Sequence, residues 1–124
     1  MNKKIHLVVN HIEIDALLNK TRTAEAIWKI LPIKSRVQLW GDEIYFPIPL
    51  HMESENGKEI VSFGDLGYWP QGDCFCIFFG PTPISRGAEI RPASPVNVFG
   101  KILGDATILK KVQEGSTIVV TALE

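Results

Sequence analysis

The sequence has little of what marks nucleic-acid-binding or membrane proteins. Lysine and arginine together number 13 against 14 acidic residues, the net charge is −1, and the basic residues are spread along the chain. Proteins that bind nucleic acids usually carry a basic stripe or patch, which is missing here. No apolar run approaches the roughly 20 residues that a membrane-spanning helix needs. We therefore expect neither a nucleic acid nor a membrane among the partners.

Cysteine is also scarce, and the two cysteines are badly placed for a disulfide. Cys74 and Cys76 would lie two residues apart on one strand, pointing to the same face. That arrangement puts their Cα atoms about 6.5 Å apart with parallel side chains, a poor disulfide geometry. Residues 1–10 start with charge and lack a small-residue cleavage site, unlike a signal peptide. Both observations favour a cytoplasmic location.

The residues that usually build metal and catalytic sites are not grouped in the sequence. The three histidines, His6, His11 and His51, are far apart, so we expect no metal. No glycine-rich phosphate loop is present, and we expect no cofactor. The cysteines lie in an apolar segment without a nearby cation, which favours buried structural thiols over nucleophiles.

The length and composition of the chain are those of one ordinary soluble domain. It has 124 residues, of which 45% are hydrophobic and 22% are charged. A chain of this length buries about two-thirds of its unfolded surface and needs no disulfide or metal to fold. We find no linker or internal repeat, so residues 1–124 are predicted to form a single domain.

Short apolar and alternating segments predict a mainly β protein. We expect strands at residues 5–9, 12–17, 35–40, 43–48, 59–63, 66–69, 74–79, 96–103 and 117–123. A helix capped by Thr21 or Thr23 should run to Pro32, and Asp105 should cap a short helix at 106–112. Frequent turns without βαβ alternation favour a barrel or sandwich.

Four segments resemble one family of proteins over essentially the whole chain. They are LWGDEIYF (39–46), GDLGYWP (64–70), FCIFFGPTP (75–83) and RPASPVNVFG (91–100). In this order they are similar to the cyclophilin-like domains of small prokaryotic proteins of uncharacterised function. The resemblance implies a mainly β fold, a closed eight-stranded β-barrel with two short helices.

A fainter resemblance connects the chain to the true cyclophilins, which are peptidyl-prolyl isomerases. Thr23-Ala24-Glu25 and residues 96–102 look like segments that are architectural in that family. The isomerase strand differs, because only the final Gly-Asp of its Gln-Gly-Gly-Asp stretch is present, as Gly41-Asp42. Isomerase catalysis needs a cation at the twisting amide nitrogen. Arg36 is the one arginine nearby and the only candidate catalytic residue.

The segment 74–79 is apolar on both faces, which points to a second buried layer or a ligand pocket. By alternation Phe75, Ile77 and Phe79 share one face, and Cys74, Cys76 and Phe78 share the other. One face should pack inside the barrel. The other must lie under a helix, under a loop, or in a pocket.

Eight residues are candidates for ligand binding. The aromatic ones either fill the core or line a pocket, and Arg86 and Arg91, in the loop 80–95, either bind an anion or are solvated. Asn97 either faces a ligand or satisfies backbone groups of a nearby loop. The aromatic candidates are Trp40, Tyr45, Tyr68, Trp69 and Phe78.

These patterns favour a non-catalytic module that binds an unknown small molecule or a proline-containing peptide. One alternative is a weak peptidyl-prolyl isomerase, which the fold resemblance alone suggests. The other is a protein-interaction subunit, which an exposed apolar patch would support. The patterns do not predict an oligomeric state.

Overall fold

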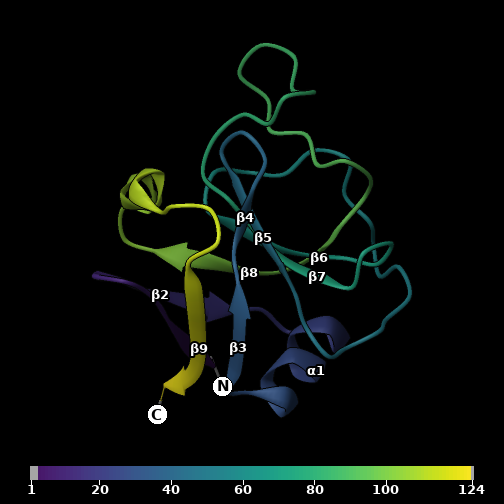
Figure 1. Ribbon diagram of the computed structural model, residues 1–124. Coiled ribbons are helices and arrows are strands. Elements are labelled where there is room, and N and C mark those ends of the chain that lie inside the picture. Colours follow the sequence, from purple (N-terminus) through teal and green to yellow (C-terminus); the bar gives the residue numbers. More distant parts are fainter. Residues whose placement is uncertain (1–2, 124) are drawn as a thin grey trace.

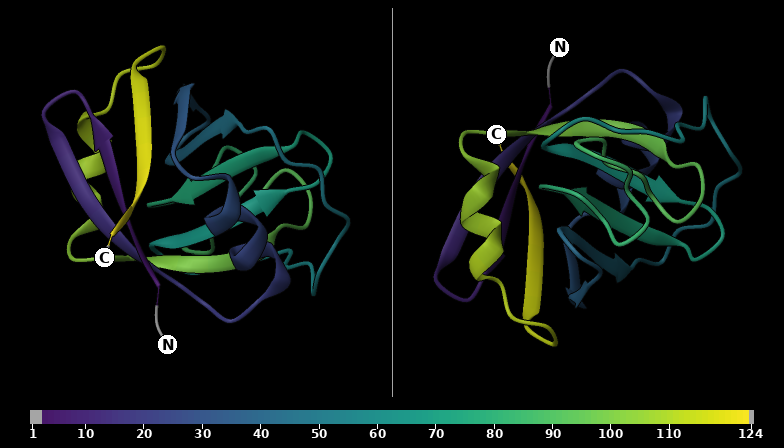
Figure 2. Two further views of the ribbon diagram at one scale, coloured as in Figure 1. Left: turned by 90° about the horizontal axis from the view of Figure 1, so that it is seen from below. Right: turned by 90° about the horizontal axis from the view of Figure 1, so that it is seen from above.

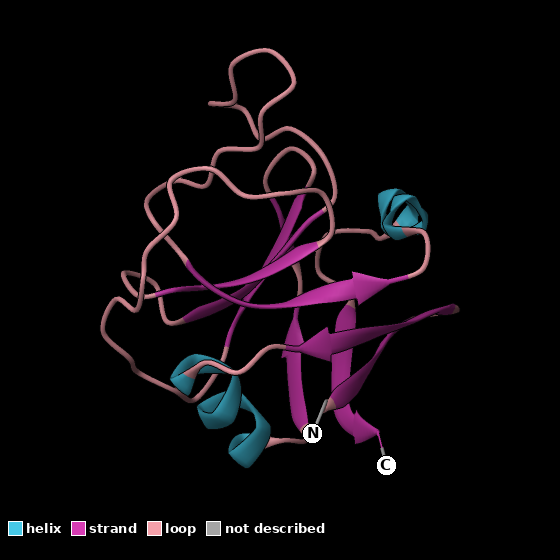
Figure 3. Ribbon diagram, turned by 180° about the vertical axis from the view of Figure 1, so that it is seen from behind, coloured by secondary structure: helices cyan, strands magenta, loops and turns pink. Residues whose placement is uncertain are grey.

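The structure is a computed structural model that describes residues 3–123. Its strands form one 9-stranded sheet rolled into a nearly closed barrel (Figures 1 and 2). The strands are β1 (Lys4–Val9), β2 (Ile12–Leu18), β3 (Ile33–Arg36), β4 (Gln38–Leu39), β5 (Glu43–Pro47), β6 (Asp65–Trp69), β7 (Cys74–Phe78), β8 (Asn97–Leu103) and β9 (Thr117–Leu123). The helices are α1 (Arg22–Ile30) and the 3₁₀ helix η1 (Ala106–Lys111), and they lie on opposite sides of the barrel (Figure 3).

The barrel closes through a single chain segment, residues 33–39. The strand order is β3-β9-β1-β2-β8-β6-β7-β5-β4, so the two edge strands of the sheet are consecutive in sequence. Between them lies Val37, whose N–H donates to Ser116 O at 2.9 Å and whose carbonyl accepts from Gly115 N at 2.9 Å. The predicted strand 35–40 is thus two short strands, β3 paired with β9 and β4 paired with β5. Counted as one bent strand, they give the predicted eight-stranded barrel.

The predicted strand at 59–63 is wrong. This segment contributes one isolated bridge, between Val61 and Ile90, and a second joins Lys58, just before it, to Val96. Of its five residues only Val61 is buried, whereas Ile60 and Phe63 are exposed. A segment with one buried side chain has no apolar face to hold it in a sheet.

Stacked aromatic rings and aliphatic side chains fill the barrel. The rings of Phe46 and Phe75 stack with centroids 4.8 Å apart, and Phe99 meets Phe75 edge-on at 4.9 Å. Ala24 and Ile27 of α1 are buried in the same core. The Thr21 side chain caps this helix by accepting from Ala24 N, so of the two caps that the sequence allows, Thr21 and Thr23, the first is the one used.

The prediction that β7 is apolar on both faces is confirmed. Phe75 and Ile77 belong to the barrel core, whereas Cys74, Cys76 and Phe78 form a second buried cluster on the outer face. Val61, Ile90 and Val96 join that second cluster from the segments that cover it. The loops that carry Val61, Ile90 and Val96 therefore cover the outer face of the sheet at β5, β7 and β6, and we call these loops the roof. The candidate site lies between the sheet and this roof.

Candidate functional site

A two-residue turn places Trp40 and Glu43 side by side at one end of β5. Trp40 N donates to Glu43 O at 2.9 Å and Glu43 N donates to Trp40 O at 3.2 Å, across Gly41 and Asp42. Gly41 has φ +61°, a conformation that glycine adopts without strain. Residues directly opposite each other in a hairpin point to the same face, and so does Tyr45, two residues after Glu43.

The opposite wall of the site is built on β6. The Trp69 indole donates from Nε1 to Ser94 Oγ at 2.6 Å, which ties its ring to the loop before β8. Gly72 lies against that ring, because a Cβ there would come within 2.4 Å of it. At Gly67 a Cβ would come within 2.8 Å of Val96, so the missing side chain lets the loop pack on the sheet.

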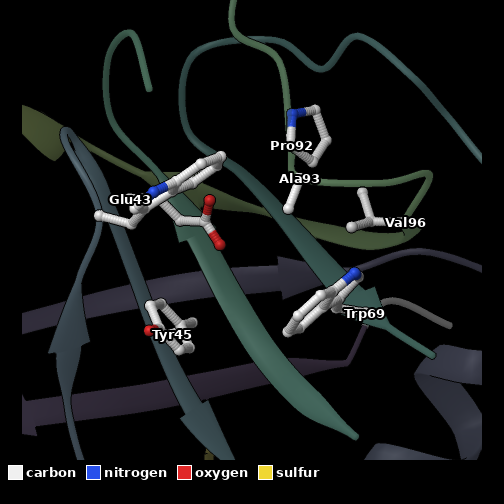
Figure 4. A pocket seen from close by; sticks show the side chains of 7 residues that line it. Glu43, Tyr45, Trp69, Pro92, Ala93 and Val96 are labelled. Carbon is white, nitrogen blue, oxygen red and sulfur yellow. The ribbon is translucent and has the colours of Figure 1, made fainter. Parts of the chain in front are cut away.

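These elements enclose a pocket of about 270 Å³ (Figure 4). The floor and walls come from β5, β6 and the β4–β5 turn, and the residues just before β8 form the upper side. Its lining is mainly apolar and aromatic, with one ionisable carboxyl, a composition typical of ligand sites. The lining residues are Trp40, Glu43, Tyr45, Trp69, Pro92, Ala93 and Val96.

Glu43 is the chemically unusual residue of this pocket. Its side chain is only 6% exposed, and its Oε1 has no hydrogen-bond partner among the described residues. Burial raises the pKa of Glu43 from its ordinary 4.5 to about 7, an effect that the neighbouring Cys76 thiol offsets only in part. Figure 4 shows the carboxylate directed into the space between Tyr45 and Trp69. Near neutral pH the carboxyl is thus poised between its neutral and charged forms.

The two cysteines beneath the pocket are unsuited to nucleophilic chemistry. Burial, together with the nearby charges of Asp73 and Glu43, raises the pKa of Cys74 to about 11. Cys76 is 1% exposed, and burial raises the pKa of its thiol well above the ordinary value. Both thiols stay protonated at neutral pH, and only the thiolate is a strong nucleophile.

Three of the aromatic candidates, Trp40, Tyr45 and Trp69, meet in the pocket, and two do not. Tyr68 is fully buried on the barrel side, where its hydroxyl donates to Leu50 O at 2.8 Å. Phe78 is fully buried in the outer cluster and does not line the pocket.

The polar candidates lie outside the pocket lining. Arg91 donates from Nε to Glu89 at 2.8 Å, so a carboxylate of the chain already occupies its guanidinium, and Arg86 is exposed in the same loop. The exposed Arg36 donates to a main-chain carbonyl near β9 at 3.3 Å. Asn97 is buried; its side chain accepts from Glu55 N at 2.8 Å and donates to the carbonyl of residue 53.

Glu43 itself was missed by sequence reasoning. Its alternation with Ile44 and Phe46 assigns it to the outer face of the barrel, where a carboxylate normally meets water. The available clue was the apolar outer face of residues 74–79, which requires a covering layer. Because β5 pairs with β7, the layer that covers the outer face of β7 also covers the outer face of β5. Register then places Glu43 opposite Phe78 and Tyr45 opposite Cys76.

Two further features of the described residues bear on function. Between residues 3 and 123, no three histidine, cysteine, aspartate or glutamate side chains converge closely enough to hold a metal ion. In the same part of the chain, no helix is both long and apolar enough to cross a membrane.

Comparisons with known proteins agree with this fold. Residues 3–121 match a family model described as cyclophilin-like. The chain is also similar to a hypothetical protein from Archaeoglobus fulgidus of known solution structure, with 41% identity and a TM-score of 0.83. That match covers 97% of this chain and 94% of the archaeal one. A search of curated proteins gives no match.

Proposed function

This chain belongs to the cyclophilin-like family, and we propose that it is a non-catalytic binding module whose ligand occupies the pocket between Trp40, Tyr45 and Trp69. One observation carries the proposal: a mainly apolar pocket has a buried carboxyl with an unpartnered oxygen. Buried polar atoms are nearly always hydrogen-bonded, and a site awaiting a ligand accounts for the exception.

The size of the pocket limits the ligand. At about 270 Å³ it lies just below the usual range of ligand pockets, roughly 300–1,000 Å³. A small molecule fits this volume, and so does one inserted side chain of a peptide, such as a proline ring. Proline rings pack well on flat aromatic surfaces, and the two tryptophans offer such surfaces.

The chemistry of the lining supports binding over catalysis. Glu43 is the one lining residue that titrates near neutral pH, and the thiols beneath it are held protonated. The isomerase alternative would require a cation beside the apolar surface. Its candidate, Arg36, is engaged with Gly115 O outside the pocket lining.

A ligand-detected NMR screen of small fragments and proline-containing peptides tests this proposal. We expect hits whose signals revert to the free state when the protein carries Trp40→Ala, because that change removes one wall. Arg36→Ala is the control, since it truncates a large exposed side chain four residues before Trp40 but leaves the pocket lining intact. The proposal fails if the screen gives no hit, or if every hit survives Trp40→Ala in a folded protein.

A further inference from the structure

We propose that the ligand of this pocket carries a positive charge, as an organic ammonium group placed among the three aromatic rings and against the Glu43 carboxylate. This inference rests on the proposed binding function and specifies the chemical class of the ligand. It is drawn from the combination of rings and acid, neither of which would indicate a cation alone.

The rings supply the first part of the argument. Trp40, Tyr45 and Trp69 line one small cavity from two strands and a turn, so a group within it faces more than one ring. Aromatic faces attract cations, tryptophan most strongly, and the attraction increases when water is excluded. The described lining residues include no lysine or arginine that would occupy those rings.

The carboxyl supplies the second part. An ammonium ion would give the unpartnered Glu43 oxygen an opposite charge and, when it carries N–H groups, a hydrogen-bond donor. An anionic ligand would be repelled by the carboxylate. A neutral apolar ligand would remove the carboxyl further from water without providing a partner, which is unfavourable. A neutral ligand with an N–H or O–H group could donate one hydrogen bond to Glu43, whereas a cation also supplies the opposite charge, so a cation gains most from this carboxylate.

Among residues 3–123, no cationic side chain lines the pocket beside Glu43. The titratable groups that face Glu43 are Cys76 and Cys74 of β7 and Tyr45 of β5, all neutral at pH 7 with raised pKa values. The adjacent Asp42 instead accepts from Lys110 Nζ at 3.1 Å, which keeps that lysine occupied.

Arg91, which directly precedes the lining residue Pro92, is a cation of the segment above the pocket. It is paired with Glu89 at 2.8 Å and more distantly with Glu59 at 3.9 Å. The pocket thus combines a buried acid with aromatic walls and leaves the position of the cation open for a ligand.

Choline and 3,3-dimethylbutan-1-ol form a suitable probe pair, because they have the same shape and differ in charge. Binding is followed by chemical-shift changes in ¹H–¹⁵N spectra of the whole chain, with the Trp40 and Trp69 indole N–H signals as reporters. We expect choline to bind at least tenfold more tightly than the alcohol at pH 8. Because choline does not titrate, its affinity should fall about tenfold per pH unit below about 7 as Glu43 takes up a proton.

Glu43→Gln is the decisive variant, because it keeps the shape of the side chain and removes the charge. It should reduce the preference for choline over the alcohol at pH 8 to the part that the aromatic rings supply, and it should flatten the pH profile, whereas Arg36→Ala should leave both unchanged. A preference at pH 8 that is as large in Glu43→Gln as in the parent protein would overturn the inference. If the alcohol binds as tightly as choline, the inference fails while the pocket remains a binding site. If neither compound binds, the inference fails, and the broader screen decides the proposed function separately.

Discussion

Replacing Glu43 by glutamine should stabilise the protein at alkaline pH and change its stability little in acid. The carboxyl is buried in the folded chain, with one oxygen unpartnered, and is solvated in the unfolded chain. Its pKa is about 7 when folded and near the ordinary 4.5 when unfolded. Between these values the folded state holds a proton that the unfolded state has lost, so stability falls as pH rises through this window.

The size of the effect follows from the two pKa values. A change in pKa from 4.5 to about 7 corresponds to roughly 3 kcal/mol of unfolding free energy, lost gradually across that range and constant above it. Below about pH 4.5 the protonated acid and the amide are close in shape and charge. The advantage of Glu43→Gln should therefore grow from near zero at pH 4 to roughly 3 kcal/mol at pH 8, or about 10 °C in Tm.

Urea denaturation of both proteins at a series of pH values measures this difference directly. Carboxylate partners also raise the pKa values of His6 and His51, but both histidines are present in both proteins and their effects cancel in the comparison. A stability difference that is the same at pH 4 and pH 8 would refute the account of Glu43 as a buried acid with one unpartnered oxygen. So would a variant that is less stable than the parent at pH 8.

Three other outcomes follow from the structure. Gly72→Ala should weaken binding of any pocket ligand about tenfold in NMR titrations while the fold persists. The added methyl would lie only 2.4 Å from the Trp69 ring and would push that ring out of its position in the pocket wall. Glu55→Gln should cost about 1–2 kcal/mol in urea denaturation, because Glu55 accepts two backbone N–H groups in the first turn of α1. A thiol reagent at pH 8 should modify neither Cys74 nor Cys76 until the protein is unfolded, because both are buried with raised pKa values.

Features that depend on local patterns could be predicted from the sequence. Alternation along residues 74–79 was enough to place Phe75 and Cys76 on two different apolar faces, one of them inside the barrel, and the structure shows that Phe75 belongs to the core. The Thr21 cap and the end of α1 before Pro32 follow from side-chain hydrogen bonding and from the constraint that proline places on the backbone. Such features involve residues a few positions apart, so the sequence around them carries the information.

Features set by distant partners could not be predicted in this way. The segment around Val37 pairs with β9 on one side and β5 on the other, and nothing in its own residues indicates that it changes partner there. Residues 59–63 have the composition of a strand, yet they pack by Val61 alone beneath the loop near Ile90. Whether an apolar segment joins a sheet depends on which other segments of the protein lie beside it in the fold.

The position of Glu43 shows how the two kinds of information combine at the site. Alternation along β5 correctly directs Glu43 and Tyr45 away from the barrel core, and by itself this predicts a solvated carboxylate. The apolar outer face of β7 requires a cover, and register extends that cover over β5. A carboxyl on a covered face needs a partner, and the described chain provides none for Oε1. The same roof that completes the fold thus raises the pKa of Glu43 and leaves room beside it, which is why we place the ligand there.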